Sequence, residues 1–298
     1  MVARVIEAAE SDSGERLDVF LARQVPELSR ARAKATIERG AVSVNGRRMT
    51  KSYRIRAGDR IELAELPHPV DFHCAPDPTL DLVVLVETDD FVIVDKPAGV
   101  PSHPLAPEER GTLAGALVAR YPEMRDVGYG KREPGIVHRL DTGTSGVMLA
   151  ARTQRAFAEL REELRAGRIE KRYLARCAGE VEAPRIIDAA IANDPRDRRK
   201  VRACSDRREI QRLGAQAART EILASSPAPG GSLVEVRANH ARRHQIRVHL
   251  ASIGHPLLGD LVYGGPAFES ASHHLLHASA IRVGDVHAES NAWKYRDS

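Results

Sequence analysis

The stretch GIVHRLDTGTSGVMLAAR, residues 135–152, places a charged, glycine-containing turn between two hydrophobic segments. Ile136 and Val137 lead into the turn, and the apolar run after it is typical of a buried strand. Asp141 is therefore expected at the edge of a core, where a carboxylate is stable only beside a polar partner. Such a carboxylate is a candidate for chemistry. From this stretch alone, the simpler interpretation is that Asp141 caps the backbone N–H groups of a glycine-rich turn.

Several familiar active-site motifs do not fit the sequence. There is no GxxxxGK[ST] phosphate loop, and the residues around Ser145 lack the second glycine of a GxSxG turn. A kinase catalytic loop needs Asp directly after His-Arg, whereas Leu140 intervenes here. No HExxH occurs, and pairs such as His244 and His249 are not spaced as metal ligands on one helix face. We therefore expect no metal and no other cofactor, and expect the histidines to be structural or to contact a binding partner.

Hydrophobic patterning beyond Leu82 predicts many strands with a few helices between them. Because the two types do not alternate strictly, the pattern favours an α+β domain with a large mixed, mainly antiparallel sheet. The predicted strands lie within 82–97, 145–152, 171–180, 185–192, 218–226 and 232–240, and the predicted helices cover 112–121, 153–166 and 244–253.

The first part of the chain predicts a smaller α/β domain over residues 13–66. Two helical patterns come first, with Ser29 as a candidate N-cap of the second, and Asn45-Gly46 then predicts a hairpin. Residues 29–60 contain ten Lys or Arg against Glu38 and Asp59, which indicates a polyanionic partner such as RNA. The proline-rich residues 67–81 read as a linker to a catalytic domain over 82–290.

Length and composition exclude several classes of protein. The 298 residues contain no apolar run near the roughly 20 needed to span a bilayer. The N-terminal residues lack the apolar segment of a secretory signal. Cys74, Cys177 and Cys204 are odd in number and far apart, so we expect reduced thiols in a cytoplasmic protein.

Two further segments carry residues suited to partner a reactive carboxylate. In RIEKRYLAR, residues 168–176, strand alternation sends Lys171 and Tyr173 to the same face. In residues 241–265, the helical stretch is expected to place Arg243 and Arg247 on one face.

Taken in order, these segments resemble pseudouridine synthases of the RluA type, in the branch that acts on large-subunit ribosomal RNA. The resemblance rests on HRLD–TSG, Lys-x-Tyr and HQIRVHLA–GHP–GD–YG, together with DDFVIVDKPAGVPSHP at 89–104 and LLHA at 275–278. It covers about 85–280. Residues 13–66 separately resemble the S-four-like RNA-binding domain through RLDVFL, SRARAKATIERG, VSVNG and AGDRI.

The resemblance implies an enzyme that isomerises uridine in RNA to pseudouridine and takes the target base out of its stack. It implies Asp141 as nucleophile or base, Arg247 as its counter-charge, and Tyr173 as the residue that stacks on uracil and could deprotonate carbon 5. Arg139 would fill the space left by the flipped base. Further RNA contacts are expected from Arg30, Arg32, Lys34, Arg47, Lys51 and Arg243. RNA is the expected partner of a monomer that needs no membrane and no obligate protein partner.

Two alternatives stay open from the sequence. The chain could be an RNA-binding ribosome-assembly factor without activity, or it could carry out the same chemistry on transfer RNA. The family pattern is also not matched everywhere. Ala241-Arg242-Arg243 stands where Gly-Arg-Thr is common, and Thr142-Gly143 stands where a basic and then an acidic residue often follow the aspartate. Neither difference removes a proposed catalytic group.

Overall fold

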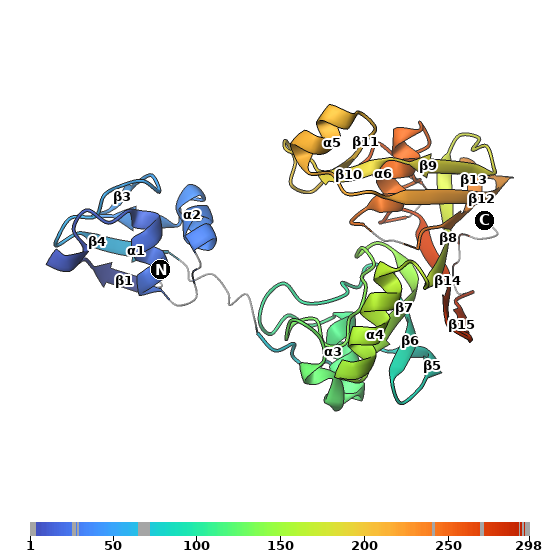
Figure 1. Cartoon of the computed structure of the whole chain (residues 1–298), viewed down its shortest axis with the longest axis horizontal. Helices are drawn as coiled ribbons and strands as arrows, with labels where there is room; N and C mark the ends of the chain where they lie inside the picture. The colour runs from blue at the N-terminus through green and yellow to red at the C-terminus, as the bar shows by residue number, and fades with distance from the viewer. Residues whose placement is uncertain are drawn as a thin grey trace. The chain divides into compact units, whose positions relative to one another are not determined.

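The chain folds into two compact units, residues 1–72 and 73–298, which we describe separately. The structure is a computed structural model and describes residues 4–25, 28, 30–64, 72–239, 242–268, 271–291, 293 and 295 (Figure 1). The predicted N-cap Ser29 and the first part of the predicted linker, residues 67–71, lie outside the described residues. Among the helices described, none is long and apolar enough to cross a membrane.

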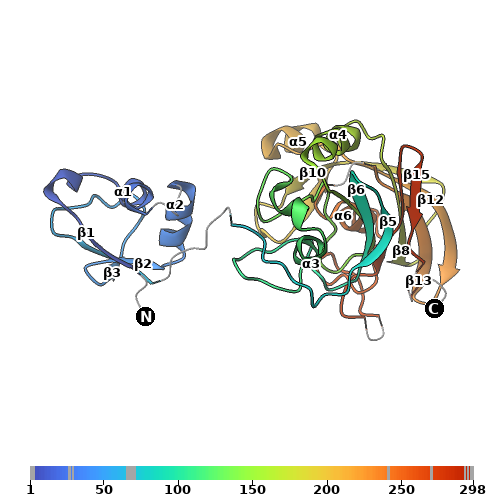
Figure 2. The same ribbon diagram turned by 90° about the horizontal axis from the view of Figure 1, so that it is seen from below.

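The first unit packs two helices along one side of a small sheet (Figure 2). Phe20 and Leu21 from the first helix meet Val44 and Ile61 from the strands in one buried cluster. All pairs are antiparallel, in the order β1-β4-β2-β3. The elements are β1 (Arg4–Glu7), the 3-10 turn η1 (Glu10–Asp12), α1 (Leu17–Gln24), α2 (Arg30–Glu38), β2 (Val42–Val44), β3 (Arg47–Arg48) and β4 (Arg60–Leu63).

The predicted hairpin of the first unit is confirmed by the backbone. Asn45 and Gly46 both have positive φ, 52° and 77°, as the turn of a tight two-residue hairpin requires. Strand β1 precedes residue 13, where the predicted domain begins, and it pairs with β4 along the register from Arg4 with Leu63 to Glu7 with Arg60.

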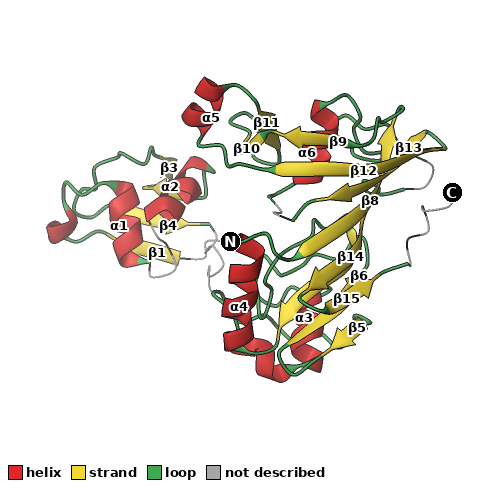
Figure 3. Cartoon of the chain, turned by 45° about the vertical axis from the view of Figure 1, so that its right-hand side comes forward, coloured by secondary structure: helices red, strands yellow, loops and turns green. Residues whose placement is uncertain are grey.

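The second unit is built on a nine-stranded sheet in the order β5-β6-β7-β14-β8-β13-β12-β9, with β15 paired to β14 (Figure 3). Only β7 and β14 run parallel among these described pairs, so the mixed and mainly antiparallel sheet predicted from the sequence is confirmed. The strands are β5 (Val83–Glu87), β6 (Phe91–Lys96), β7 (Ser145–Ala151), β8 (Glu170–Ala178), β9 (Arg185–Asp188), β12 (Arg219–Ala228), β13 (Gly231–Arg237), β14 (Leu276–Val283) and β15 (Val286–Glu289).

Helices lie near both ends of this sheet, with α3 and α4 toward β6 and β7 and with α6 toward β12 (Figure 1). The side chains of Thr112 and Thr153 cap α3 and α4 by accepting hydrogen bonds from Gly115 N and Ala156 N. All three predicted helices are present. The helical elements are α3 (Leu113–Arg120), η2 (Pro122–Asp126), α4 (Gln154–Arg165), α5 (Arg207–Leu213) and α6 (Gln245–Ser252).

Three features differ from the expectations. The predicted strand 185–192 is two strands, because β9 pairs with β12 whereas β10 (Ala190–Asn193) leaves the sheet to pair with β11 (Val201–Cys204). Strand β14 occupies the middle of the sheet although its pattern predicted no strand. Arg243 precedes α6 instead of sharing a helical face with Arg247, because His244, the N-cap, has a left-handed backbone with φ 53°.

A close approach of two strands fixes the position of the turn that carries Asp141. Gly146 in β7 has φ +109°, and a Cβ there would lie 2.1 Å from the carbonyl oxygen of Ala278 in β14. Only glycine permits this contact. The turn before β7 is therefore held directly against the centre of the sheet.

Part of the proline-rich segment belongs to the second unit. Cys74 N–H donates to the carbonyl of Lys131 at 3.0 Å, and the buried Asp77 carboxylate accepts from Gly111 N–H at 2.7 Å. Cys74, Cys177 and Cys204 are all free and buried.

Candidate active site

The backbone of the Asp141 turn is held in place by hydrogen bonds from a neighbouring loop. Ser102 Oγ donates to the carbonyl of Leu140 at 2.8 Å, and Gly99 N–H donates to the carbonyl of Thr142 at 2.8 Å. Within the turn, Thr144 N–H donates to the carbonyl of Asp141 at 3.0 Å. The backbone on both sides of Asp141 is therefore fixed before any ligand binds.

Lys96 holds the same turn through hydrogen bonds to backbone carbonyls. Its buried ammonium donates to the carbonyl oxygens of Pro97, Val100 and Thr142 at 2.9, 2.8 and 3.3 Å. Burial lowers the pKa of Lys96 to about 8, although the charges of Asp141 and Asp95 oppose this change. Lys96 acts through the turn and is a positioning residue.

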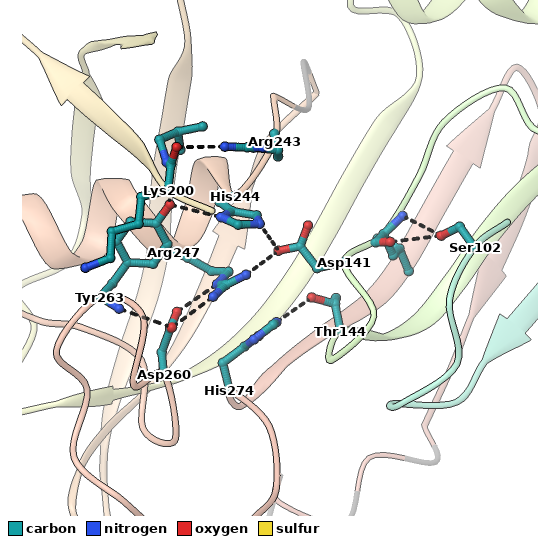
Figure 4. A network of polar contacts seen from close by, with 12 residues as sticks. Ser102, Asp141, Thr144, Lys200, Arg243, His244, Arg247, Asp260, Tyr263 and His274 are labelled. Carbon is teal, nitrogen blue, oxygen red and sulfur yellow. Dashed lines mark hydrogen bonds and ion pairs between the residues drawn. The ribbon is translucent and has the colours of Figure 1, made fainter. Parts of the chain in front are cut away.

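Arg247 lies between two carboxylates and joins them in one chain of charges (Figure 4). Its Nη1 donates to Asp141 Oδ2 at 2.9 Å. Its Nε and Nη2 donate to the two carboxylate oxygens of Asp260 at 2.7 and 2.9 Å. Because Asp260 binds the guanidinium through two hydrogen bonds, the direction of Nη1, which donates to Asp141, is fixed.

The electrostatics of this chain keep Asp141 ionised. Burial opposes the charge, but the nearby groups His244 and Arg247, together with the Arg247 hydrogen bond, lower the pKa of the Asp141 carboxyl below its usual value. The pKa of Arg247 is raised, because bonds and charges from Asp260 and Asp141 outweigh its burial. The carboxylate is therefore ionised at neutral pH. Because the Asp141 side chain is 24% exposed, it is also open to a ligand.

His244 and Tyr263 form a second support around Asp141. Val201 N–H donates to the Tyr263 hydroxyl at 3.0 Å, which lies 2.9 Å from His244 Nδ1. This arrangement lets the hydroxyl donate to Nδ1 and turns the Nε2 hydrogen of the neutral ring toward Asp141 Oδ2, 4.0 Å away. Burial lowers the pKa of His244, although Asp141 opposes the change. The Arg247 guanidinium also lies over the Tyr263 ring, 5.2 Å from its centroid.

Tyr173 projects from β8 into a small recess that Asp141 and Arg247 also line. The ring is 4% exposed, and burial together with the Asp141 charge raises the pKa of its hydroxyl. The recess opens beside a larger cavity of about 900 Å³. Asp141 and Arg247 line both spaces, so the ionised carboxylate stands where the two meet.

The other residues predicted to contact RNA are placed in different surroundings. Arg139 lines the cavity, is 55% exposed, and lies 3.5 Å from Glu133. Arg243 also lines it, but its Nη2 donates to the carbonyl oxygens of Arg198 and Lys200 at 3.1 and 2.7 Å.

The remaining predicted contacts belong to the first unit. Arg30 Nε lies 3.4 Å from Asp18, and Lys51 Nζ lies 3.0 Å from Glu38. Arg47 is exposed on β3, and α2 carries both Arg32 and Lys34.

Five residues of the site carry no role predicted from the sequence. Two of them stand in the quoted GD–YG segment, which could have pointed to them, and two are histidines that had been treated only as a group. Their positions depend on folding, because no local pattern directs them at Asp141. The five are Lys96, His244, Asp260, Tyr263 and His274, whose Nε2 lies 2.8 Å from the Thr144 hydroxyl.

No cluster of three or more His, Cys, Asp or Glu side chains that could hold a metal occurs within the part of the chain that the structure describes. The arrangement itself offers an ionised carboxylate, a fixed guanidinium and an aromatic ring around a recess. Such a set of groups can bind a planar ring and attack it or remove a proton from it.

Known proteins share the sequence and the fold. The family model described as RNA pseudouridylate synthase matches residues 90–252, and the S4 domain model matches residues 15–61. An uncharacterized RNA pseudouridine synthase of Chloroflexus aurantiacus is 38% identical over 98% of this chain and 88% of its own length. Ribosomal large subunit pseudouridine synthase D of Xanthomonas campestris is 36% identical over 86% of this chain and 73% of its own length.

Among solved structures, human RNA pseudouridylate synthase domain containing 1 superposes with a TM-score of 0.54 and 25% identity, covering 72% of this chain and 85% of that chain. The resemblance first seen in the HRLD–TSG and HQIRVHLA segments is thus confirmed over both parts of the chain. The protein belongs to the RNA pseudouridine synthase family and carries an N-terminal S4 domain.

Proposed function

We propose that this RNA pseudouridine synthase modifies large-subunit ribosomal RNA and uses Asp141 as the nucleophile or base that acts on a flipped-out uridine. The observation that carries the proposal is the chain Asp141–Arg247–Asp260, which holds one ionised carboxylate open to a cavity. The RNA substrate is inferred from relatives such as ribosomal large subunit pseudouridine synthase D of Xanthomonas campestris.

The net reaction breaks the bond between uracil N1 and ribose C1′, joins C5 to C1′, and moves one hydrogen from C5 to N1. Asp141 is ionised at neutral pH, so it is ready to attack or to accept a proton without a further base. Arg247 supplies the counter-charge and directs the carboxylate toward the recess. Because Asp260 already occupies the rest of the guanidinium, little reorganisation is needed when substrate binds.

Tyr173 is proposed to stack on the uracil ring, and its hydroxyl is the candidate base for C5. Its raised pKa keeps the phenol protonated in the free protein but makes the phenolate, once formed, a stronger base. Arg139, exposed at the cavity, is proposed to occupy the space that the flipped base leaves in the RNA.

The S4 domain is proposed to add affinity that does not depend on sequence. It would do so by phosphate contacts from Arg30, Arg32, Lys34, Arg47 and Lys51, with Arg243 contributing from the catalytic unit. The sequence assigned the RNA-binding module to 13–66, the connection to 67–81 and the catalytic domain to 82–290. Strand β1 extends the first of these toward the N-terminus, and the contacts of Cys74 and Asp77 attach the end of the connection to the catalytic unit.

The first experiment replaces one carboxylate oxygen. Asp141→Asn should abolish tritium release from RNA labelled at carbon 5 of uridine, a loss of at least about 10³-fold, while the dissociation constant for RNA stays within about threefold. Asp126→Asn is the matched control, because this carboxylate is exposed outside the cavity and should leave activity unchanged. Full activity in Asp141→Asn would contradict the assignment.

Mapping of pseudouridine in a gene-deletion strain decides between the substrates. We expect one or more ribosomal sites to be lost and then restored by the wild-type gene but not by Asp141→Asn. Loss confined to transfer RNA would identify that RNA as the substrate instead. No lost site, together with a defect in ribosome assembly, would favour the binding-protein alternative.

A further inference from the structure

Three side chains that line the 900 Å³ cavity each carry a hydrogen-bond donor that has no acceptor among the residues that the structure describes. They come from different elements: His138 precedes the Asp141 turn, Arg161 belongs to α4, and Lys171 belongs to β8. The mechanism proposed above uses none of them. Because buried donors are nearly always paired in folded proteins, this group calls for an explanation.

Lys171 is the most deeply buried of the three. The residue is only 3% exposed. No hydrogen bond or ion pair joins its ammonium to any residue that the structure describes. Burial alone lowers the pKa of Lys171 to about 8, with no contribution from Asp141 or any other carboxylate. At neutral pH the group is therefore mostly charged, and it is distinct from the Asp141–Arg247 pair.

The His138 ring lies in the wall of the same cavity and carries a donor whose position is fixed. Leu149 N–H donates to Nε2 at 3.1 Å, so Nε2 carries a lone pair and the hydrogen of the neutral ring is on Nδ1. Burial, and then the charges of Lys171 and Arg161, lower the pKa of His138 to about 3, so the ring stays neutral. Its Nδ1 is buried and has no partner among the described residues.

Arg161 completes the group. Its Nη1 donates to the carbonyl of Val137 at 2.9 Å, whereas its buried Nε has no partner in the described chain. Glu133 lines the same cavity, but it lies 3.1 Å from His103 and 3.5 Å from Arg139. The three donors therefore share a positive region that no described carboxylate neutralises.

We propose that Lys171, Arg161 and the Nδ1–H of His138 form an anion subsite that holds a backbone phosphate of the RNA next to the flipped uridine. A phosphodiester offers several acceptor oxygens on one negative group, which suits donors contributed to one cavity by three segments of the chain. RNA is the polyanion that must enter this cavity for its uridine to reach Asp141, so the assignment rests on the proposed function.

The test follows Lys171 itself, in the full-length protein with ¹³C at lysine Cε. Adding saturating octauridylate should raise the pKa of Lys171 from about 8 to about 9, because a bound phosphate stabilises the charged amine. Lys96 is the matched control in the same spectrum. Its pKa is also about 8, but its ammonium is already bound to three carbonyls and should not respond. Lys171→Arg assigns the signal by removing it.

Two further arms identify the ligand. Octauridylate with a neutral methylphosphonate backbone should leave the pKa of Lys171 unchanged; an equal rise would mean that the lysine contacts base or sugar. Inorganic phosphate at the same concentration should have a smaller effect than octauridylate. A larger effect would identify a free-ion site and overturn the assignment to RNA.

Variants give a second measure. Lys171→Met and Arg161→Met should each weaken RNA binding about tenfold and reduce the slope of log affinity against log salt by about 0.7, the value for one phosphate contact on single strands. Arg155→Met, on the exposed side of the same helix as Arg161, should change neither. If Lys171→Met does not fold, the affinity and the salt dependence of Arg161→Met decide whether the subsite exists.

An unchanged Lys171 signal at saturating RNA, with wild-type affinity in Arg161→Met, would refute the subsite. Tritium release by the wild-type protein and its loss in Asp141→Asn are measured separately. The subsite can therefore fail while the proposed reaction stands, and the reverse outcome is equally visible.

Discussion

Arg247 and Lys171 are both buried cations in the wall of one cavity, yet their surroundings are opposite. Arg247 is 5% exposed and contacts two carboxylates, which raise its pKa. Lys171 is 3% exposed and contacts no carboxylate in the described part of the chain, and burial lowers its pKa to about 8. A charge that is already paired can position a reacting group, whereas an unpaired one gains its partner when ligand binds. The difference thus separates the part of the site proposed for the chemistry from the part proposed to hold RNA.

The strongest test of this contrast is stability. Arg247→Met should lower the free energy of unfolding by about 3–5 kcal/mol and reduce tritium release to background, because it leaves the buried Asp260 carboxylate and Asp141 without their cation. Lys171→Met should lower the free energy of unfolding by no more than about 1 kcal/mol, since it removes a buried charge that has no partner among the described residues. Urea unfolding with both variants and with Arg155→Met as an exposed control measures the difference. Equal destabilisation by the two buried substitutions would break the contrast.

The second prediction concerns the aromatic side of the site. Tyr173→Phe keeps a ring that can stack but removes the hydroxyl, so RNA affinity should stay within about twofold while single-turnover tritium release falls about 10²–10⁴-fold. The pKa of the Tyr173 hydroxyl is raised, so only a small fraction is phenolate at neutral pH. Because this fraction increases with pH, the wild-type rate should also increase with pH. Residual activity of the Phe variant should lack that dependence. A rate near that of the wild type in Tyr173→Phe would leave this residue with stacking alone.

The smallest expected effect is the pH dependence of RNA binding. The folded pKa of Lys171 lies near 8, so the charged form that binds phosphate is lost as pH rises above this value. Phosphate binding raises the pKa of the amine, so affinity should be constant below about pH 7, fall about twofold by about pH 8 and fall about eightfold by about pH 9.5. Lys171→Arg stays charged across this range and should show a flatter curve by fluorescence anisotropy. Identical curves for the two proteins would show that Lys171 does not sense the ligand.

Local patterns predicted the elements whose signal is contained in neighbouring residues. Helices α3, α4 and α6 follow from apolar spacing, and the β2–β3 hairpin follows from Asn45-Gly46. The patterns failed where pairing decides the structure. Residues 276–283 form strand β14 because they pair with β7 on one side and β8 on the other. Residues 185–192 divide because β9 and β10 have different partners. Neither fact is encoded in the alternation of side chains along a single segment.

Within the site, the sequence by itself determined to which family the chain belongs and which groups are proposed to react, since both depend on residue types in ordered motifs. Asp141, Tyr173 and Arg247 were all identified in this way. Only the tertiary structure decided which charges have partners. Asp141 and Arg247 are 106 positions apart, and Asp260 was not assigned to either, so their chain exists only after folding. The same holds for Lys171, because a lack of partners is a property of the completed cavity and of no segment within it.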